Sequence, residues 1–139
     1  MNITDNIQDF IPQRPPFVHL DKLRFCNEEE TISSFEIKAE HIMVKNGQLT
    51  AGGLVENIAQ TAAAGTGYLS SEAGEEVKRG YIGAVKNLTV NKLPEVGTQI
   101  YTRIYSTNQV LNVNIIKGEV HDNDGYLYAQ CEMKIFLEE

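Results

Sequence analysis

Several features that mark large functional classes are scarce in this sequence or missing from it. Lysine and arginine number only 12 against 19 acidic residues, which gives a net charge of −7 and an isoelectric point near 5.0. Proteins that bind nucleic acid need a basic surface, and no basic run occurs here, so we expect no nucleic acid partner. Zinc-finger spacing and a nucleotide-binding glycine loop are also absent, so we expect no metal and no cofactor.

Cysteine and long apolar runs are equally scarce. The two cysteines, Cys26 and Cys131, are far apart and lack metal-ligand spacing, so we expect reduced thiols. No apolar run reaches the roughly 18 residues that a membrane span requires, which argues against a membrane protein. Residues 1–10 lack the basic start and the apolar core of a signal peptide. Together these absences predict a cytoplasmic protein.

The apolar content is sufficient for one folded domain. Hydrophobic residues make up 42% of the 139 positions, and the mean hydropathy is −0.27. A chain of this length can bury a core without disulfides or metals. We therefore expect a single domain over residues 1–139.

Turn residues divide the chain into segments whose apolar periodicity predicts their secondary structure. In chain order, the sequence predicts a short helix over 4–11, strands over 17–25 and 31–39, a loop over 40–50, a helix over about 51–69, and strands over 78–90, 98–106, 111–120 and 126–137. Asn46-Gly47 and residues 122–125 are strong turn signals. Thr50 stands where it can cap the long helix.

The long helix and the last strands predict how these elements pack. Apolar residues form one stripe along the helix, and small residues at 62–67 allow a sheet to approach it closely. Alternation is clearest over 126–137, and in the preceding strand it places Leu111, Val113 and Ile115 on one face. The sequence therefore predicts an α+β fold in which an antiparallel sheet, its last four strands a meander, wraps one long helix. Because the far face of such a sheet stays uncovered, we expect dimerisation.

Residues 41–60 hold the most informative pattern for function. His41 precedes Glu56 by 15 residues, and Gly52-Gly53 stand just before that glutamate. Glu56 lies in an apolar, alanine-rich helix that has little other use for a charge. An imidazole and a carboxylate at one apolar cavity can move protons on and off a small organic substrate.

Four segments follow a known family pattern in order and spacing. Residues 11–23, IPQRPPFVHLDKL, are similar to Leu-Pro-His-Arg-x-Pro-Phe-Leu-Leu-Val-Asp, and His41 stands at the histidine of a Gly-His-Phe-Pro motif. Residues 52–60, GGLVENIAQ, are similar to Gly-Val-Leu-Ile-x-Glu-Ala-x-Ala-Gln, and residues 81–97 to a Tyr-Phe-Ala-Gly strand with a Pro-Gly turn. The chain thus resembles the 3-hydroxyacyl-acyl-carrier-protein dehydratases of the FabZ type, as a divergent member. The resemblance spans nearly the whole chain and implies a single hotdog domain.

The resemblance also implies a reaction, the dehydration of a 3-hydroxyacyl thioester to the trans-2-enoyl thioester. His41 would be the base that takes the C2 proton, and Glu56 would help the 3-hydroxyl leave as water. In that family the two residues come from opposite protomers, which implies a homodimer or a trimer of dimers. Gly52, Gly53 and Gln60 are implied as substrate-binding residues, since amides at a helix start favour developing negative charge.

The substrate carrier is expected to be an acyl carrier protein or coenzyme A. Carrier proteins are acidic, as this chain is, so binding one requires a local basic patch. Candidates for that patch are Lys78, Arg79, Lys86 and Lys92. Without the patch, a coenzyme A thioester becomes the better substrate. The pathway, whether fatty acid, pigment or polyketide synthesis, stays open.

Two departures from the family pattern keep other functions open. Gln13 replaces the histidine of the opening motif, and the loop after His41 reads IMVKNGQLTA instead of a proline- and glycine-rich run. These changes favour a divergent branch, such as those of aryl-polyene or resorcinol pigment pathways. One alternative is an acyl thioesterase in which Glu56 activates water or attacks the thioester. The other is a catalytically inactive, acyl-binding partner subunit.

The remaining polar residues that stand out are expected to have structural roles. His19 lies in the first predicted strand, where a histidine is usually a packing or surface residue. His121 precedes a hairpin turn and is expected to be solvated. Asp21 matches the aspartate of the family motif, and we expect it to make a structural hydrogen bond.

Overall fold

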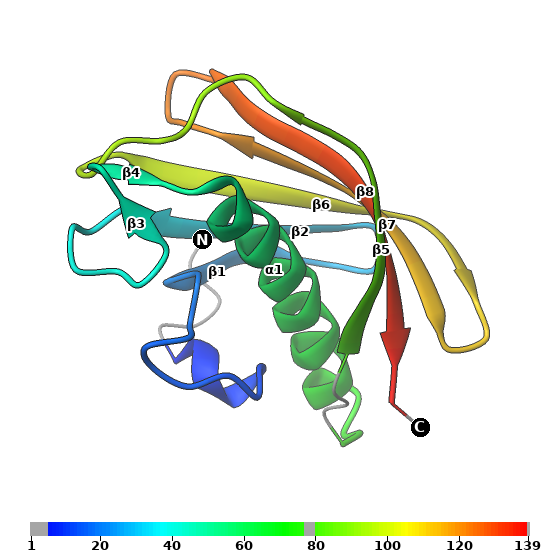
Figure 1. The fold of residues 1–139 in the computed structure, drawn as a ribbon. Helices are drawn as coiled ribbons and strands as arrows, with labels where there is room; N and C mark the ends of the chain where they lie inside the picture. The colour runs from blue at the N-terminus through cyan, green and yellow to red at the C-terminus, as the bar shows by residue number, and fades with distance from the viewer. Residues whose placement is uncertain (1–5, 77–79, 139) are drawn as a thin grey trace.

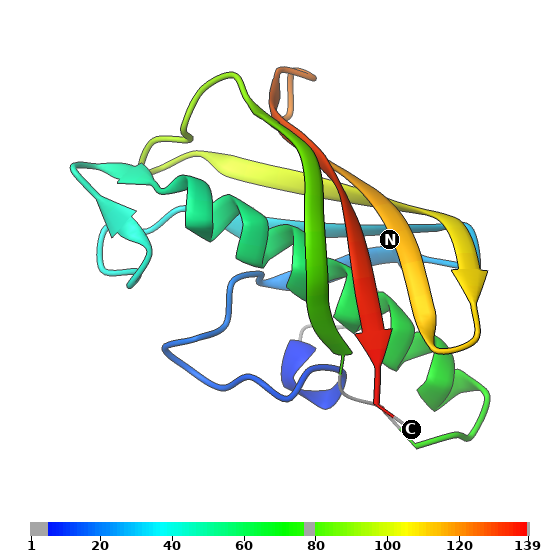
Figure 2. The same cartoon turned by 45° about the vertical axis from the view of Figure 1, so that its right-hand side comes forward.

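The computed structural model describes residues 6–76 and 80–138, and it confirms an α+β architecture built on one long helix. The elements are η1 (Ile7–Asp9), β1 (Lys22–Cys26), β2 (Glu30–Glu36), β3 (Val44–Lys45), β4 (Gln48–Leu49), α1 (Ala51–Glu72), β5 (Gly80–Val90), β6 (Gln99–Val110), β7 (Val113–His121) and β8 (Leu127–Leu137). Figure 1 shows α1 lying along one face of a curved antiparallel sheet, and Figure 2 shows β5 and β8 crossing in front of it.

Local signals at the start of α1 act as the sequence predicts. The side chain of Thr50 accepts a hydrogen bond from the Gly53 backbone N–H at 3.1 Å, which caps the helix. Asn46 and Gly47 both have positive φ angles in the tight β3–β4 hairpin, which leads into that cap. The helix then continues to Glu72, three residues beyond the predicted end.

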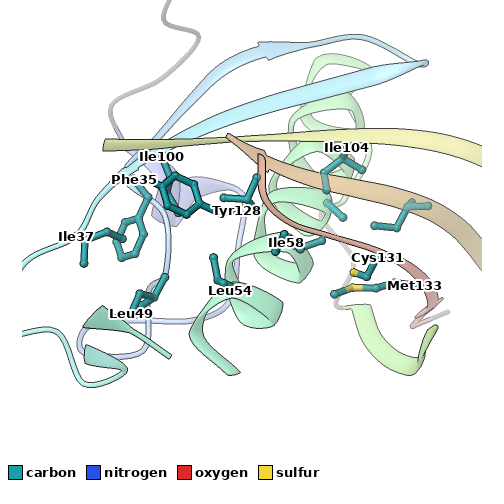
Figure 3. Close-up of a cluster of buried hydrophobic side chains, with 14 of the residues drawn as sticks. Phe35, Ile37, Leu49, Leu54, Ile58, Ile100, Ile104, Tyr128, Cys131 and Met133 are labelled. Atoms are coloured by element: carbon teal, nitrogen blue, oxygen red, sulfur yellow. The ribbon is translucent and has the colours of Figure 1, made fainter. Parts of the chain in front are cut away.

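The main core lies between α1 and the concave face of the sheet. Leu54 and Ile58 of the helix are fully buried there, and Figure 3 shows them among side chains from several strands. The sheet comes close because β7 carries Gly118 beneath the helix, where a Cβ atom would lie 2.5 Å from Ile58 Cγ2. On the helix side, Gly65 lies directly against Thr31 of β2, as its small size predicts. A second, smaller core joins α1 to the N-terminal segment.

The sheet order, β1-β2-β6-β7-β8-β5, corrects the predicted meander of the last four strands. Of these four strands, only β6, β7 and β8 are joined by hairpins. β5 pairs with β8, and no strand of the described residues pairs with its other edge. After β5 the chain first passes the start of β8. There the backbone N–H of Asn91 donates to the Tyr128 carbonyl at 2.8 Å.

Two predictions for the N-terminal third are wrong in their extent. The helix predicted over 4–11 is a single 3-10 turn at Ile7–Asp9, with residues 4 and 5 outside the described residues. The strand predicted over 17–25 begins only at Lys22, because the backbone before it is bound by helix side chains instead of a neighbouring strand.

The inward face of β7 is also the opposite of the predicted one. Ile116 and Val120 are buried against the helix, together with Gly118, whereas Leu111 is 89% exposed. Leu111 has a φ angle of 56° and belongs to the β6–β7 turn, so it does not begin the strand. Since side chains alternate along a strand, choosing the wrong phase reverses every inward residue.

Candidate functional site

The segment just before β1 is attached to α1 by two buried amide side chains. Gln60 Oε1 accepts a hydrogen bond from the His19 backbone N–H at 2.7 Å, and Gln60 Nε2 donates to the Phe17 carbonyl at 2.9 Å. Asn57 Nδ2 donates to the His19 carbonyl at 2.6 Å. Buried backbone groups must be paired, and here the helix pairs them. The backbone position of His19 is therefore set by α1.

Asn57 is itself held by a buried polar network. Its side-chain oxygen accepts a hydrogen bond from the hydroxyl of Thr102 on β6. The Thr61 hydroxyl donates to the Asn57 carbonyl at 2.7 Å and lies 2.7 Å from the hydroxyl of Ser33 on β2. All four residues are buried. The network joins the helix, the sheet and the His19 segment into one rigid unit.

His41 lies in the loop after β2 and faces His19. Its Nε2 is 3.1 Å from His19 Nδ1 and 3.1 Å from the Val18 carbonyl oxygen. On the other side of the ring, the Met43 backbone N–H donates to His41 Nδ1 at 3.1 Å. The ring also packs edge-on against Phe35, with centroids 5.2 Å apart. His41 is therefore fixed by contacts to three separate parts of the chain.

These contacts determine which ring nitrogen of His41 carries the proton. A backbone N–H can only donate, so His41 Nδ1 must accept and the proton of the neutral ring lies on Nε2. That proton points to the Val18 carbonyl and to His19 Nδ1, which therefore also accepts. Both ring nitrogens of His41 are therefore engaged by protein groups in the single chain.

His19 is held in its neutral form by the same arrangement. Burial, with a smaller effect of the neighbouring His41 in the same direction, lowers the pKa of His19 to about 4. A second proton on His19 Nδ1 would face the proton on His41 Nε2 directly. His19 therefore presents an acceptor to His41 throughout the neutral pH range.

His41 and Glu56 line different cavities of the single chain. His41 borders a cavity of about 380 Å³ between residues 15–21, the end of β2 and the loop that follows it. Glu56 is partly buried and lines a cavity of about 310 Å³ whose other wall includes Gly80, Tyr81 and Ile82 of the edge strand β5. One chain alone therefore does not bring the two predicted catalytic residues together.

The Glu56 cavity also contains Gln13, the residue that replaces the motif histidine. Gln13 Oε1 is buried and, among the described residues, is the one buried side-chain oxygen or nitrogen without a hydrogen-bond partner. An unpaired buried acceptor is costly unless a ligand or water satisfies it. The oxygen thus marks this cavity as one with unmet hydrogen-bonding capacity.

The three residues predicted to bind substrate have different surroundings. Gly53 is buried, and its N–H is used by the Thr50 cap. Gly52 is exposed at the second position of α1, where its backbone N–H belongs to the positive, N-terminal end of the helix dipole. Gln60 uses both ends of its side-chain amide to hold residues 17 and 19, although it also borders the Glu56 cavity.

The sequence did not single out His19 as part of a candidate site. It is 4% exposed and was expected to pack in a strand, yet it meets His41 from 22 residues away. The family pattern has an apolar residue at this position, and a polar ring between Val18 and Leu20 was the one available signal. Asp21 behaves as predicted, since its carboxylate accepts the Glu36 N–H at 2.8 Å.

Comparison with known proteins identifies the family of this chain. A family model described as ApeP dehydratase, of the ApeP-like family, matches residues 5–139. The chain belongs to the ApeP-like dehydratase family. The resemblance to hotdog dehydratases is therefore confirmed, whereas the FabZ type in particular stays a prediction. A comparison with curated protein sequences found none that matches.

Solved structures of similar shape support the same fold. A chain of the ApeI:P dehydratase heterocomplex from Xenorhabdus doucetiae has a TM-score of 0.89 at 13% identity, covering 96% of this chain and 91% of that one. An uncharacterized protein from Pyrococcus horikoshii has a TM-score of 0.71 at 10% identity, covering 100% and 95%. A hypothetical thioesterase from Streptococcus pneumoniae, solved with coenzyme A, has a TM-score of 0.67 at 9% identity, covering 84% of each chain. At these identities the likeness establishes the hotdog fold.

The described residues also bear on membranes and metals. None of the helices within 6–76 and 80–138 has the length and apolar character needed to cross a membrane. The same residues contain no cluster of three or more histidine, cysteine, aspartate or glutamate side chains placed to hold a metal ion. Cys26 and Cys131 are free thiols, and burial raises the pKa of Cys131 to about 11.

Proposed function

We propose that this protein dehydrates a 3-hydroxyacyl thioester, carried by an acyl carrier protein, to the trans-2-enoyl thioester. The reaction removes a proton from C2, breaks the C3–oxygen bond and releases the hydroxyl as water. The match of residues 5–139 to a dehydratase family carries this proposal. An imidazole and a carboxylate that each line a cavity are suitable groups for the two proton transfers.

We propose His41 and Glu56 as those two groups, brought together by a second chain with the same fold. The Glu56 cavity is bounded by β5, whose outer edge has no partner strand within residues 6–76 and 80–138. Exposed apolar side chains of that strand, Tyr81, Ile82, Val85 and Leu88, would be covered by the second chain. The partner is a second copy in a homodimer or trimer of dimers, or a different chain, as in the ApeI:P heterocomplex.

Gly52 and Gln60 complete the proposed site in different ways. The Gly52 amide at the start of α1 would donate to the thioester carbonyl oxygen as negative charge develops there. Gln60 would keep its hydrogen bonds to residues 17 and 19 and form the floor between the helix and the substrate. Gly53 allows the β3–β4 hairpin to pack tightly, because a Cβ atom there would lie 2.6 Å from Leu49 Cδ1.

Exposed lysines near β5 bear on which carrier holds the substrate. Of the predicted basic patch, Lys86 and Lys92 are exposed on β5 and just after it, whereas residues 78 and 79 lie outside the described residues. An exposed pair of lysines beside the proposed dimer edge would favour an acidic carrier protein. A coenzyme A thioester is the alternative, since similar folds have been solved with coenzyme A and acetyl coenzyme A.

A single assay tests the proposal and its alternatives. Purified protein is incubated with a 3-hydroxyacyl thioester on either carrier, while the conjugated double bond and free thiol are followed together. Double-bond formation without thiol supports dehydration, and it should fall by about 100-fold or more in Glu56→Gln. The exposed Glu95→Gln is the matched control and should retain full activity.

The other outcomes of this assay identify the alternative functions. Thiol release without a double bond would establish the thioesterase, whose fold also occurs among the similar structures. Tight binding of the thioester without either product, both alone and together with a partner chain, would establish the acyl-binding subunit. Either result would overturn the proposed dehydratase activity.

A further inference from the structure

The cavity bordered by Glu56 holds few polar groups with spare hydrogen-bonding capacity. Two of its polar side chains are already occupied, because Gln60 binds the backbone before β1 and the Tyr81 hydroxyl donates to Glu138 Oε2 at 3.1 Å. Gln13 Oε1 is buried and accepts no hydrogen bond from the part of the chain that the structure describes. The Glu56 carboxylate has no partner within that part either. These two groups are therefore left for a ligand.

Gln13 belongs to a segment whose backbone is fixed on both sides of it. Residues 10–17 lie along α1 (Figures 1 and 2), because one end packs against Gly67 and the other is bound by Gln60. Between these two points, the Arg14 guanidinium donates to the Gln13 backbone carbonyl at 2.8 Å. A fixed backbone does not let the unpaired side-chain oxygen move to a partner elsewhere. The oxygen therefore needs a donor that enters the cavity.

We infer that Gln13 binds the 3-hydroxyl group of the substrate by accepting its O–H hydrogen, and that it then holds the water which this hydroxyl becomes. The inference rests on the proposed dehydration, because it names the group that holds the leaving hydroxyl beside Glu56. A hydroxyl donates one hydrogen and accepts at two lone pairs. When Glu56 gives a proton to one lone pair, the hydroxyl hydrogen still needs an acceptor. Gln13 Oε1 is the unpaired acceptor that shares the cavity.

The apolar part of the lining makes this hydrogen bond selective. It includes Ala59 and Ala63 of α1 and Ile82 and Ile135 of the sheet, whose side chains offer no hydrogen bond. A saturated acyl group in the cavity would therefore leave the Gln13 oxygen unpaired, at a cost in binding. A site built to bind a hydroxyl discriminates against an analogue that lacks it. The cavity should thus prefer a 3-hydroxyacyl group to the saturated acyl group of equal length.

The atoms of the reaction balance with Gln13 chemically unchanged. His41 takes the C2 proton, and the electrons of that C–H bond form the C2–C3 double bond. The C3–oxygen bond breaks with its electron pair on oxygen, and Glu56 gives that oxygen a proton. The resulting water directs one hydrogen to Gln13 Oε1 and the other to the Glu56 carboxylate. The proton on His41 returns to Glu56 through solvent as the products leave.

Ligand binding tests the hydrogen bond without turnover. In the Glu56→Gln variant, calorimetry compares a 3-hydroxyhexanoyl thioester with the hexanoyl thioester, on the carrier that supports dehydration by the wild type. We expect the hydroxylated ligand to bind about 5- to 10-fold more tightly, and Gln13→Met, which has a poor acceptor, to remove most of that preference. Gln13→His should keep it, since a neutral imidazole has an acceptor nitrogen. An unchanged preference in Gln13→Met overturns the inference, whereas a wild type that forms no double bond overturns the proposed function.

Kinetics tests the same hydrogen bond during turnover. We expect Gln13→Met to lower kcat/KM for dehydration by about 10-fold, and Gln13→His to stay within about 3-fold of the wild type. Gln109→Met makes the same chemical change at an exposed position of β6 and should retain full activity. Full activity in Gln13→Met would show that the hydroxyl is held by another group and would overturn the inference.

Stability and assembly distinguish substrate binding from a structural role of Gln13. Since its side-chain oxygen has no partner in the described chain, Gln13→Met should not lower the melting temperature. The variant should also sediment as the wild type does. A lower melting temperature would show that the amide supports the fold, and a smaller assembly would assign its oxygen to the interface with a partner chain. Either result overturns the inference.

Discussion

Asn57 of α1 donates a hydrogen bond from its side-chain amide to the backbone carbonyl of His19, 2.6 Å away. The same side chain accepts from the Thr102 hydroxyl, so one buried amide joins the helix, the sheet and the segment that carries His19. The position of His19 in the candidate site therefore depends on Asn57, a buried residue of the helix.

Replacing Asn57 should destabilise the whole protein. In Asn57→Ala the His19 carbonyl and the Thr102 hydroxyl lose their partner while they stay buried, which costs about 2–4 kcal/mol of the free energy of unfolding. Urea denaturation followed by circular dichroism measures this loss. Asn123→Ala, at an exposed position of the β7–β8 turn, is the matched control and should change the free energy by less than about 0.5 kcal/mol. Equal losses in both variants would contradict the role of the network.

The lowered pKa of His19 should make stability depend on pH. The folded-state value is about 4, below the unfolded value of 6.5, so the unfolded chain binds more protons between these limits. The free energy of unfolding should therefore fall as pH drops from about 6.5 to 4, and the His19 contribution should be fully present above pH 6.5. The total change from this residue is about 3 kcal/mol, from roughly 1.4 kcal/mol for each pKa unit.

The measurement compares urea denaturation of the wild type and His19→Asn across that pH range. His41 and the carboxylates near it, including Asp21, Glu36 and Glu40, are present in both proteins, so their effects largely cancel in the difference. The wild type should lose more stability than the variant as the solution is acidified. Parallel curves for the two proteins would show that His19 is not held neutral by the fold.

The sequence predicted the features of this protein that depend on nearby residues. The cap at Thr50 and the turn at Asn46-Gly47 need only a few neighbours, and both are in place. The alternation over 126–137 is equally local, and Ala129 and Met133 are buried as it predicts. The sequence did not predict which distant strands pair with each other. The position of β5 beside β8 depends on the path of the whole connection after it, which no local pattern records.

The candidate site shows the same division between local and distant signals. His41 and Glu56 stand out by residue type and spacing, and the family resemblance adds their possible roles. His19 could not be found in that way, because its contact with His41 depends on Asn57 and Gln60 binding the backbone around it. An amide in a helix looks the same in sequence whether it meets solvent or a buried chain segment.

Gly67 should be intolerant of even a methyl group. A Cβ atom at this position of α1 would collide with the backbone carbonyl oxygen of Phe10, which cannot move as a flexible side chain does. Alanine improves helix propensity by about 1 kcal/mol, but the clash should outweigh that gain and reduce stability by about 1–3 kcal/mol overall. Thermal unfolding of Gly67→Ala beside Thr66→Ala, one residue earlier and partly exposed, measures the effect. A stabilised Gly67→Ala would show that the N-terminal segment packs elsewhere.

Charge on the uncovered edge of the sheet should prevent assembly of the proposed dimer. In the part of the chain that the structure describes, no strand pairs with the outer side of β5, and Val85 and Leu88 expose 38% and 41% of their surface. Lysine at both positions would place two desolvated charges in an interface between edge strands, which disfavours strand addition. We therefore expect the wild type to sediment as a dimer or a larger assembly, and Val85→Lys/Leu88→Lys to sediment as a monomer.

Leu111→Lys is the control for that experiment, because Leu111 is 89% exposed but lies in the β6–β7 turn, away from the edge formed by β5. It should leave the sedimentation coefficient unchanged. A wild-type protein that sediments as a monomer would argue against the homodimer, and the edge variant should then be tested for loss of binding to a co-purified hotdog partner chain. Since the Glu56 cavity is bounded by β5, the same edge variant should also lose dehydratase activity, whereas Leu111→Lys should retain it.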